Sequence, residues 1–287
     1  MLRYATGEDI TGLNPHLAQQ TVVNYMASMT MAYLTKTGAH NQAVPELATV
    51  VPTQANGGIS KDGKTITWHL RRDAKWSDGV PFTADDVVFS TAAVLNPRNN
   101  EVSRSGWDLI TKVDEPDKYT VVYHLKHQFA GFEYQFFSPA GANPCILPKH
   151  ILGNLPDINH APYNALPVGI GPFKFVSWRR SDSVEMVANP LYFRGMPKLQ
   201  KIIFKIIPDR NTVLTQLRTH EIDLWSPVSR HYYPQVKAIP GLTVLRKKSY
   251  YFGHLDFNTQ HPMLRDPRVR QALRYATDRK TLLAKID

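Results

Sequence analysis

The sequence predicts a mixed α/β fold in which short strands outnumber the helices. Several segments alternate apolar and polar residues, which is typical of strands with one buried face. Other segments carry apolar residues at helical spacing behind recognisable helix starts. The chain has 287 residues, of which 43% are hydrophobic and 20% are charged. This composition supports an ordered core in one large or two medium domains and excludes global disorder.

Alternation predicts the main strands in chain order. In 65–70 the apolar residues share one face, and the Asp-Gly turn before this segment places a partner strand near Ile59. The segments 173–178 and 184–188 flank a short polar tip and therefore predict a hairpin. The remaining predicted strands lie at 119–125, 201–207, 222–224, 242–246 and 251–257.

Capping residues predict where the helices begin. Thr83 is typical of an N-cap, because two acidic residues follow it in the first turn, where the helix dipole favours them. The Asn-Pro pair at 96–97 ends that helix. Asp266 followed by Pro267 predicts a second strong helix start. Further helices are predicted at 149–152, at 211–219 and after Asp278.

The charge is uneven along the chain. The sequence has 34 Lys and Arg against 24 Asp and Glu, which gives a net charge of +10. Residues 230–287 carry 12 basic and 4 acidic side chains, which gives +8. Such a segment is typical of a protein that binds nucleic acid or an anionic membrane surface, or of a chain whose complementary acidic residues lie elsewhere. Because the basic residues lack the interleaved aromatic side chains of nucleic-acid modules, we expect no nucleic-acid partner.

Cysteine usage and hydropathy set further limits. Cys145 is the single cysteine, which excludes an internal disulfide framework and a cysteine-rich zinc site. No stretch reaches the roughly 18 apolar residues that a membrane span requires. The start of the chain leads into polar sequence without a secretory signal. The chain is therefore expected to be either cytoplasmic or a mature or trimmed form.

The sequence lacks the motifs that usually carry catalysis. The glycines in 169–171 are followed by a proline and a strand, not by the helix that a phosphate loop requires. His124 and His127 point to different faces and are not expected to bind metal. The acidic pairs at 8–9 and 85–86 have structural explanations as a solvated turn and a helix cap. The residues by themselves favour a large binding domain that is not an enzyme, with no metal and no cofactor.

Three blocks of sequence occur together and cover most of the chain. The first block is 62–87, DGKTITWHLRRDAKWSDGVPFTADDV. The second consists of 169–174, GIGPFK, and 188–195, ANPLYFRG. The third consists of 255–259, LDFNT, and 266–279, DPRVRQALRYATDR. In content and in order, these blocks resemble family 5 solute-binding proteins, the extracytoplasmic peptide- and nickel-binding components of ABC importers.

The resemblance implies a two-lobed α/β fold of the class II periplasmic binding protein type, which closes on its ligand by hinge motion. The core of the first lobe is expected at 1–44 and 165–257, with an inserted subdomain at 45–164. Residues 258–287 are expected to begin a second lobe that is largely missing, so the chain resembles a truncated form. The hinge is expected at the crossover residues Asp256, Phe257 and Asn258.

The resemblance also implies a function. It implies capture of a short peptide or similar small polar solute between the lobes and delivery to an ABC permease, in the periplasm or another extracytoplasmic space. A lone first lobe is expected to bind peptide weakly or not at all. The alternative is a structural module that self-associates through the helix at 266–286. The candidate ligand-binding residues are Glu8, Asp9, Thr21, Tyr25, Trp107, Ser138, Gly141 and Ser226, with a packing role favoured for Tyr25 and Trp107.

Overall fold

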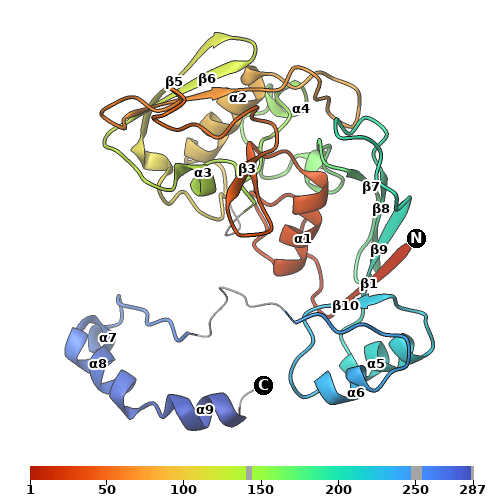
Figure 1. Ribbon diagram of the computed structural model, residues 1–287. Helices are drawn as coiled ribbons and strands as arrows, with labels where there is room; N and C mark the ends of the chain where they lie inside the picture. The colour runs from red at the N-terminus through yellow and green to blue at the C-terminus, as the bar shows by residue number, and fades with distance from the viewer. Residues whose placement is uncertain (140–143, 247–253, 286–287) are drawn as a thin grey trace. The chain divides into compact units, whose positions relative to one another are not determined.

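The computed structural model (Figure 1) describes residues 1–139, 144–246 and 254–285. Backbone contacts separate two compact units, Met1–Leu224 and Trp225–Asp287. Strands and helices are interspersed along the chain, which confirms the predicted mixed α/β class. Within the described ranges, no helix is both long enough and apolar enough to cross a membrane.

The larger sheet has five strands in the order β10-β1-β9-β8-β7. β1 runs parallel to β9, whereas β8 pairs antiparallel with both β7 and β9. The hairpin β7–β8 and strand β9 confirm the sequence predictions for these segments. At the sheet edge, the Arg3 guanidinium donates to both carboxylate oxygens of Asp223, at 2.7 and 2.9 Å. The strands are β1 (Leu2–Thr6), β7 (Phe173–Arg179), β8 (Ser183–Ala188), β9 (Lys201–Ile206) and β10 (Leu224–Trp225).

Helix α1 (Thr21–Thr30) packs against this sheet (Figure 1). Its residues Val22, Val23 and Met26 are buried in one apolar cluster with side chains of β1, β8 and β9. In that cluster Tyr4 stacks on Phe204, with ring centroids 4.5 Å apart. Burial of these side chains fixes the start of the chain against strands that come more than 150 residues later.

The smaller sheet has three antiparallel strands in the order β4-β6-β5. These strands are β4 (Thr65–His69), β5 (Ile110–Asp117) and β6 (Thr120–Leu125). β4 and β6 confirm the sequence predictions, and the predicted partner strand is represented by a bridge between Ile59 and Ile66. The core of this part includes Trp68, Trp76 and Trp107, which are fully buried. A separate two-stranded ribbon joins β2 (Thr35–Thr37) to β3 (Ala43–Pro45).

Helix α2 (Ala84–Leu95) begins at Thr83, as predicted, with a capping box formed by Thr83 and Asp86. The buried Asp86 carboxylate accepts the Thr83 N–H at 3.1 Å and the Trp76 indole N–H at 3.2 Å. It also accepts the backbone N–H of Lys149 at 3.0 Å, at the start of α4 (Lys149–Leu152). Burial raises the pKa of this carboxyl despite these donors. The acidic pair at 85–86 therefore belongs to a helix junction.

The remaining elements are short helices. The first unit also contains α3 (Phe132–Gln135), α5 (Arg210–Arg218) and the 3-10 turns η1 (Trp107–Leu109) and η3 (Pro162–Asn164). The second unit contains α6 (Tyr233–Lys237), α7 (Pro262–Arg265), α8 (Pro267–Ala276) and α9 (Arg279–Lys285). The Asp266 carboxylate accepts the Arg268 N–H at 2.8 Å, which confirms the predicted start of α8. The helices predicted at 149–152, at 211–219 and after Asp278 are confirmed as α4, α5 and α9.

Three strand predictions differ from the structure. β10 occupies 224–225, whereas the sequence predicts a strand at 222–224. The strand predicted at 242–246 is wrong, because this segment alternates in burial but forms no ladder among the described residues. Of the strand predicted at 251–257, residues 251–253 lie outside the described residues and 254–257 are extended without a ladder. Alternation predicts the direction in which side chains point, but a strand also requires a neighbouring strand with free backbone groups for hydrogen bonding. The division of the first lobe into core and subdomain stays a prediction.

Gly169 and Gly171 lie where two backbone segments touch. The Gly171 N–H donates to the Thr30 carbonyl at the end of α1, at 3.0 Å. A Cβ at Gly169 would lie 1.8 Å from the Thr30 oxygen, and one at Gly171 would lie 2.3 Å from the Met29 oxygen. Only glycine allows this approach. The segment then leads into β7 and not into a helix, as predicted.

Replacing Gly171 with alanine is expected to destabilise the first unit by about 1–3 kcal/mol or more, because the added methyl group forces α1 and the strand entry apart. Urea unfolding measures this loss. Gly7→Ala is the matched control, since its Cβ would meet no atom closer than 3.8 Å. A loss of equal size in both variants would contradict the packing argument.

Candidate functional site

The carboxyl ends of the neighbouring parallel strands β1 and β9 lie side by side at one end of the larger sheet. β1 ends at Thr6 and β9 at Ile206, and the Ile207 N–H donates to the Thr6 carbonyl at 2.7 Å. The loop that begins at Gly7 therefore leaves the sheet beside the chain that follows β9. In open α/β sheets, ligands bind outside the carboxyl ends of the strands. The region outside the carboxyl ends of β1 and β9 is therefore the candidate ligand-binding site.

The loop after β1 is held by the side chain of Gln20. The Gln20 amide oxygen accepts the Thr11 N–H and the Thr11 hydroxyl, both at 2.8 Å. Its amide nitrogen donates to the Asp9 carbonyl. Gln20 also occupies the N-cap position, directly before the first residue of α1, so one side chain joins the loop to the helix. Sequence reasoning missed Gln20, because a glutamine before an unpredicted helix carries no motif.

Two predicted site residues, Glu8 and Asp9, lie exposed on this loop. The Asp9 carboxylate is oriented on both oxygens: one accepts the Ile10 N–H at 2.9 Å, and the other accepts the Ser181 hydroxyl at 3.0 Å. Ser181 lies in the tip of the β7–β8 hairpin. The hairpin tip therefore contributes to the position of the loop.

Thr21 and Tyr25 lie one helical turn apart, at the start of α1. Both are partly buried, and Tyr25 meets Tyr4 edge to face with ring centroids 6.4 Å apart. Since Thr21 directly follows Gln20, the structure brings four predicted residues, Glu8, Asp9, Thr21 and Tyr25, to the same loop–helix junction. Tyr25 keeps the packing contact that the sequence favours and still has part of its surface exposed.

Trp107 and Ser138 lie in the other core. Trp107 is fully buried and packs edge to face on Phe136 and Phe137, with ring centroids 5.1 and 4.8 Å apart. Ser138 follows directly and is 1% exposed. Burial favours the packing role for Trp107, and a solute contact by either side chain stays a prediction. Gly141 lies outside the described residues.

The remaining predicted residues belong to the second unit. Ser226 follows β10 and precedes Pro227 through a cis peptide bond. Asp256 forms an ion pair with His254 at 3.2 Å, and the Asn258 side chain accepts the Gln260 N–H at 3.0 Å. A hinge role for the segment 256–258 stays a prediction.

The buried ionisable groups of the first unit include a histidine beside the single cysteine. Among the described residues, no group of three or more His, Cys, Asp or Glu side chains could hold a metal ion. Cys145 is buried, and its carbonyl accepts a hydrogen bond from His16 at 2.7 Å. The other ring nitrogen of His16 donates to the Glu101 carboxylate at 2.8 Å. Two acceptors around one imidazole require both ring nitrogens to carry protons, so His16 is a buried cation.

This buried ion pair joins distant parts of the first unit. The side chains of His16 and Glu101 are 0% and 1% exposed. Burial lowers the pKa of His16, but the charge of Glu101 and the hydrogen bonds to Glu101 and Cys145 outweigh it and raise the pKa well above its usual value. The pair is out of reach of a solute, so its role is structural.

The first unit is thus an α/β unit in which a polar loop is held at the carboxyl ends of two parallel strands, while the buried His16–Glu101 pair is structural. The model of the bacterial extracellular solute-binding proteins, family 5 (Middle), matches residues 42–286. The chain belongs to this family, which confirms the resemblance in the sequence. The sequence blocks 62–87 and 169–174, which carry the resemblance, thus correspond to the strand β4, the α2 cap and the close glycine contact.

Individual relatives agree with this assignment. Over 262 residues the chain is 30% identical to the oligopeptide-binding protein AppA of Bacillus subtilis, covering 90% of this chain and 46% of AppA. The structure of AppA with a nonapeptide superposes with a TM-score of 0.87 at 26% identity, over 99% of this chain and 55% of that one. NikZ of Campylobacter jejuni, solved with Ni(L-His), gives a TM-score of 0.84 at 30% identity, over 100% and 55% of the two chains. The chain spans about half the length of the relatives it matches.

The His16–Glu101 pair predicts how stability depends on pH. A histidine whose pKa is raised on folding stabilises the folded state fully below its unfolded value of about 6.5, and this contribution is lost as the pH rises through the folded value. We therefore expect the free energy of unfolding to fall from about pH 6.5 into the alkaline range. Urea unfolding at a series of pH values measures this slope.

Variants separate this effect from other titrations. His16→Gln alone leaves a buried carboxylate unpaired and is expected to cost about 3–5 kcal/mol. Adding Glu101→Gln is expected to recover part of that loss and to remove the His16-linked slope. His127→Gln, at an exposed histidine, is the control and should keep the slope. A double variant that retains the full alkaline decline would refute the assignment.

Proposed function

We propose that this chain captures a short peptide, or a similar small polar solute, for an ABC import system and delivers it to the transmembrane permease. The observation that carries the proposal is the shared fold with AppA, which extends over 99% of this chain. The di/tripeptide-binding protein 2 of Pseudomonas aeruginosa, 30% identical over 258 residues, supports the same solute class. In this role the protein works outside the cytoplasm, in the periplasm or an equivalent space, and catalyses no reaction.

The loop–helix junction supplies chemistry that suits a peptide. Glu8 and Asp9 offer exposed carboxylates, which accept hydrogen bonds from peptide N–H groups and attract a terminal ammonium. The neighbouring side chains of Thr21 and Tyr25 offer hydroxyl groups and an aromatic surface. We infer that Glu8, Asp9, Thr21 and Tyr25 form the first-lobe side of the solute site and that the segment 256–258 serves as the hinge.

A nickel complex is the second solute class to test, because NikZ was solved with Ni(L-His). The described residues of this chain offer no cluster of metal-ligating side chains. A metal held by its own organic ligand needs no such cluster, so nickel with histidine belongs in the same assay as the peptides.

Mutation of Asp9 tests the site. Saturation-transfer NMR with di-, tri- and oligopeptides is expected to detect binding. Asp9→Asn is expected to weaken it about five- to tenfold, which is less than the full contribution of about 1.5–3 kcal/mol from a hydrogen bond to a charged group, because Asp9 is exposed and solvent screens its charge. Asp108→Asn removes the same charge from an exposed position on η1 and should change nothing. Equal effects of the two substitutions would disprove the proposed position of the site.

The affinity of the 287-residue chain measured by itself is expected to be low. The proposed contacts come from one loop and one helix, and a ligand touched on one side buries less surface than a ligand enclosed between two lobes. Isothermal titration calorimetry measures the dissociation constant. A value in the low micromolar range would show that one lobe suffices and would contradict the requirement for closure.

A further inference from the structure

The tip of the β7–β8 hairpin, residues 179–182, lies at the same end of the larger sheet as the candidate site. β8 runs antiparallel to β9, so β8 begins beside the residues at which β9 ends. The Ile206 N–H, at the end of β9, donates to the Asp182 carbonyl in the tip at 2.8 Å. The tip carries two consecutive arginines, Arg179 and Arg180, whose guanidinium groups have different surroundings.

Arg179 is paired within the hairpin itself. Its guanidinium forms an ion pair with the Asp182 carboxylate at 2.9 Å. It also donates to the Ser183 hydroxyl at 3.1 Å. The charge of Arg179 is therefore compensated by the carboxylate of the same tip.

Arg180 has no carboxylate partner among the described residues. Its guanidinium lies over the ring of Trp178, with the guanidinium carbon 4.4 Å from the ring centroid. The Trp178 ring packs against the apolar cluster that Tyr25 also contacts. The indole N–H of Trp178 is buried without an acceptor among the described residues, so the ring offers Arg180 its face. Stacking on an aromatic face orients a guanidinium and leaves the N–H groups at its edge free to donate.

Ser181 connects this arginine to the acidic loop after β1. Its hydroxyl donates to the Asp9 carboxylate at 3.0 Å. Its φ of 56° lies in the left-handed region, which residues other than glycine rarely adopt. Such strained conformations concentrate at ligand-binding sites. Because Arg180 directly precedes Ser181, an arginine without a carboxylate partner among the described residues is held beside the loop that carries Glu8 and Asp9.

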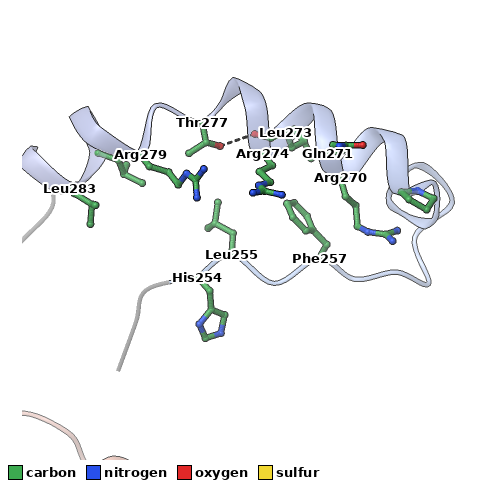
Figure 2. Close-up of a pocket in the computed structure, with 12 residues that line it drawn as sticks. His254, Leu255, Phe257, Arg270, Gln271, Leu273, Arg274, Thr277, Arg279 and Leu283 are labelled. Carbon is green, nitrogen blue, oxygen red and sulfur yellow. Dashed lines mark hydrogen bonds between the residues drawn. The ribbon is translucent and has the colours of Figure 1, made fainter. Parts of the chain in front are cut away.

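The arginines of the second unit have different surroundings. Several of them line an apolar groove, and Figure 2 shows Arg274 and Arg279 beside Leu255 and Phe257. None of the described residues that line this groove is acidic. The groove therefore offers a solute positive charge alone, whereas the carboxyl ends of β1 and β9 offer charges of both signs.

We propose that Arg180 binds a carboxylate group of the solute and thereby makes the site selective for solutes that carry both a carboxylate and an ammonium group. This inference rests on the proposed capture of a solute at the loop–helix junction. The planar guanidinium presents N–H donors that match the two oxygens of a carboxylate. The exposed carboxylates of Glu8 and Asp9 attract the ammonium group. A tripeptide spans up to about 10 Å, so its two charged ends reach different groups of one site.

A set of tripeptides tests the proposal. The probes are trialanine, its C-terminal amide, its N-acetyl derivative, and the amide of Ala-Ala-Asp, which moves the carboxylate to a side chain. Titrations by saturation-transfer NMR with the 287-residue chain compare their affinities. The amide of trialanine is expected to bind about three- to tenfold more weakly than trialanine, because it has no carboxylate for the exposed guanidinium. Recovery of the affinity with the Ala-Ala-Asp amide would show that a side-chain carboxylate also serves, and no recovery would restrict Arg180 to the terminal carboxylate.

Variants assign the preference to one side chain. Arg180→Gln is expected to remove the preference for trialanine over its amide and to keep the preference for trialanine over its N-acetyl derivative. Asp9→Asn is expected to show the opposite pattern. Arg180→Lys keeps the charge without the planar fork and should retain part of the preference. The matched control is Arg179→Gln, which removes the same charge one residue away, from an arginine already paired with Asp182. It should keep both preferences.

Three results would overturn the proposal. They are equal binding of trialanine and its amide by the unchanged chain, a preference for trialanine that persists in Arg180→Gln, or its equal loss in Arg179→Gln. Each of these leaves the proposed solute capture standing, because the peptides still bind. Absence of binding by every peptide would contradict the solute capture and this inference together. Thermal unfolding of each variant confirms that the first unit remains folded.

Discussion

The first unit depends on the contact between the backbone at Gly169–Gly171 and the end of α1. Ile170, between the two glycines, packs into the core that holds Trp68 and Trp107, and the strand that follows enters the core under the five-stranded sheet. The Gly169 carbonyl also accepts the Ser77 N–H at 2.9 Å, which connects the turn before α2 to the same point. Two separate apolar cores are thereby fixed to each other through three residues, of which Ile170 fills one core and the two glycines leave no room for a side chain.

The family motifs and the proposed site lie in different parts of this unit. The motif residues Trp76, Thr83 and Asp86 are used in a helix cap and a buried junction, so they report the fold. The loop after β1 carries exposed carboxylates. Gln20 holds the backbone of this loop, and Ser181 donates to the Asp9 carboxylate. Such a division is expected where rigid elements position variable loops that contact ligand. It explains why the sequence identifies the family readily and the solute poorly.

Local signals predicted most of the fold and little of the site. Alternation at 65–70 and the cap at Thr83 are complete within a few residues, and the structure has both. The sequence did not predict α1, because Thr21–Thr30 has β-branched residues at its start and no side-chain cap. The sequence also could not predict that Trp107 is fully buried whereas Tyr25 is partly exposed, since burial depends on neighbours distant in the chain. The contacts of Gln20 and of the His16–Glu101 pair are long-range or lack a motif, so only coordinates reveal them.

The basic residues and the exposed leucines of the second unit have a consequence for how the chain behaves in solution. At low ionic strength a net charge of +10 keeps copies of the chain apart. At about 1 M salt the screening length falls to about 3 Å, and this repulsion acts only at contact. Sulfate and similar salts also strengthen the association of exposed apolar side chains such as Leu255 and Leu283. The arginines keep the chain dispersed and the leucines favour its precipitation, and ionic strength decides which of the two prevails.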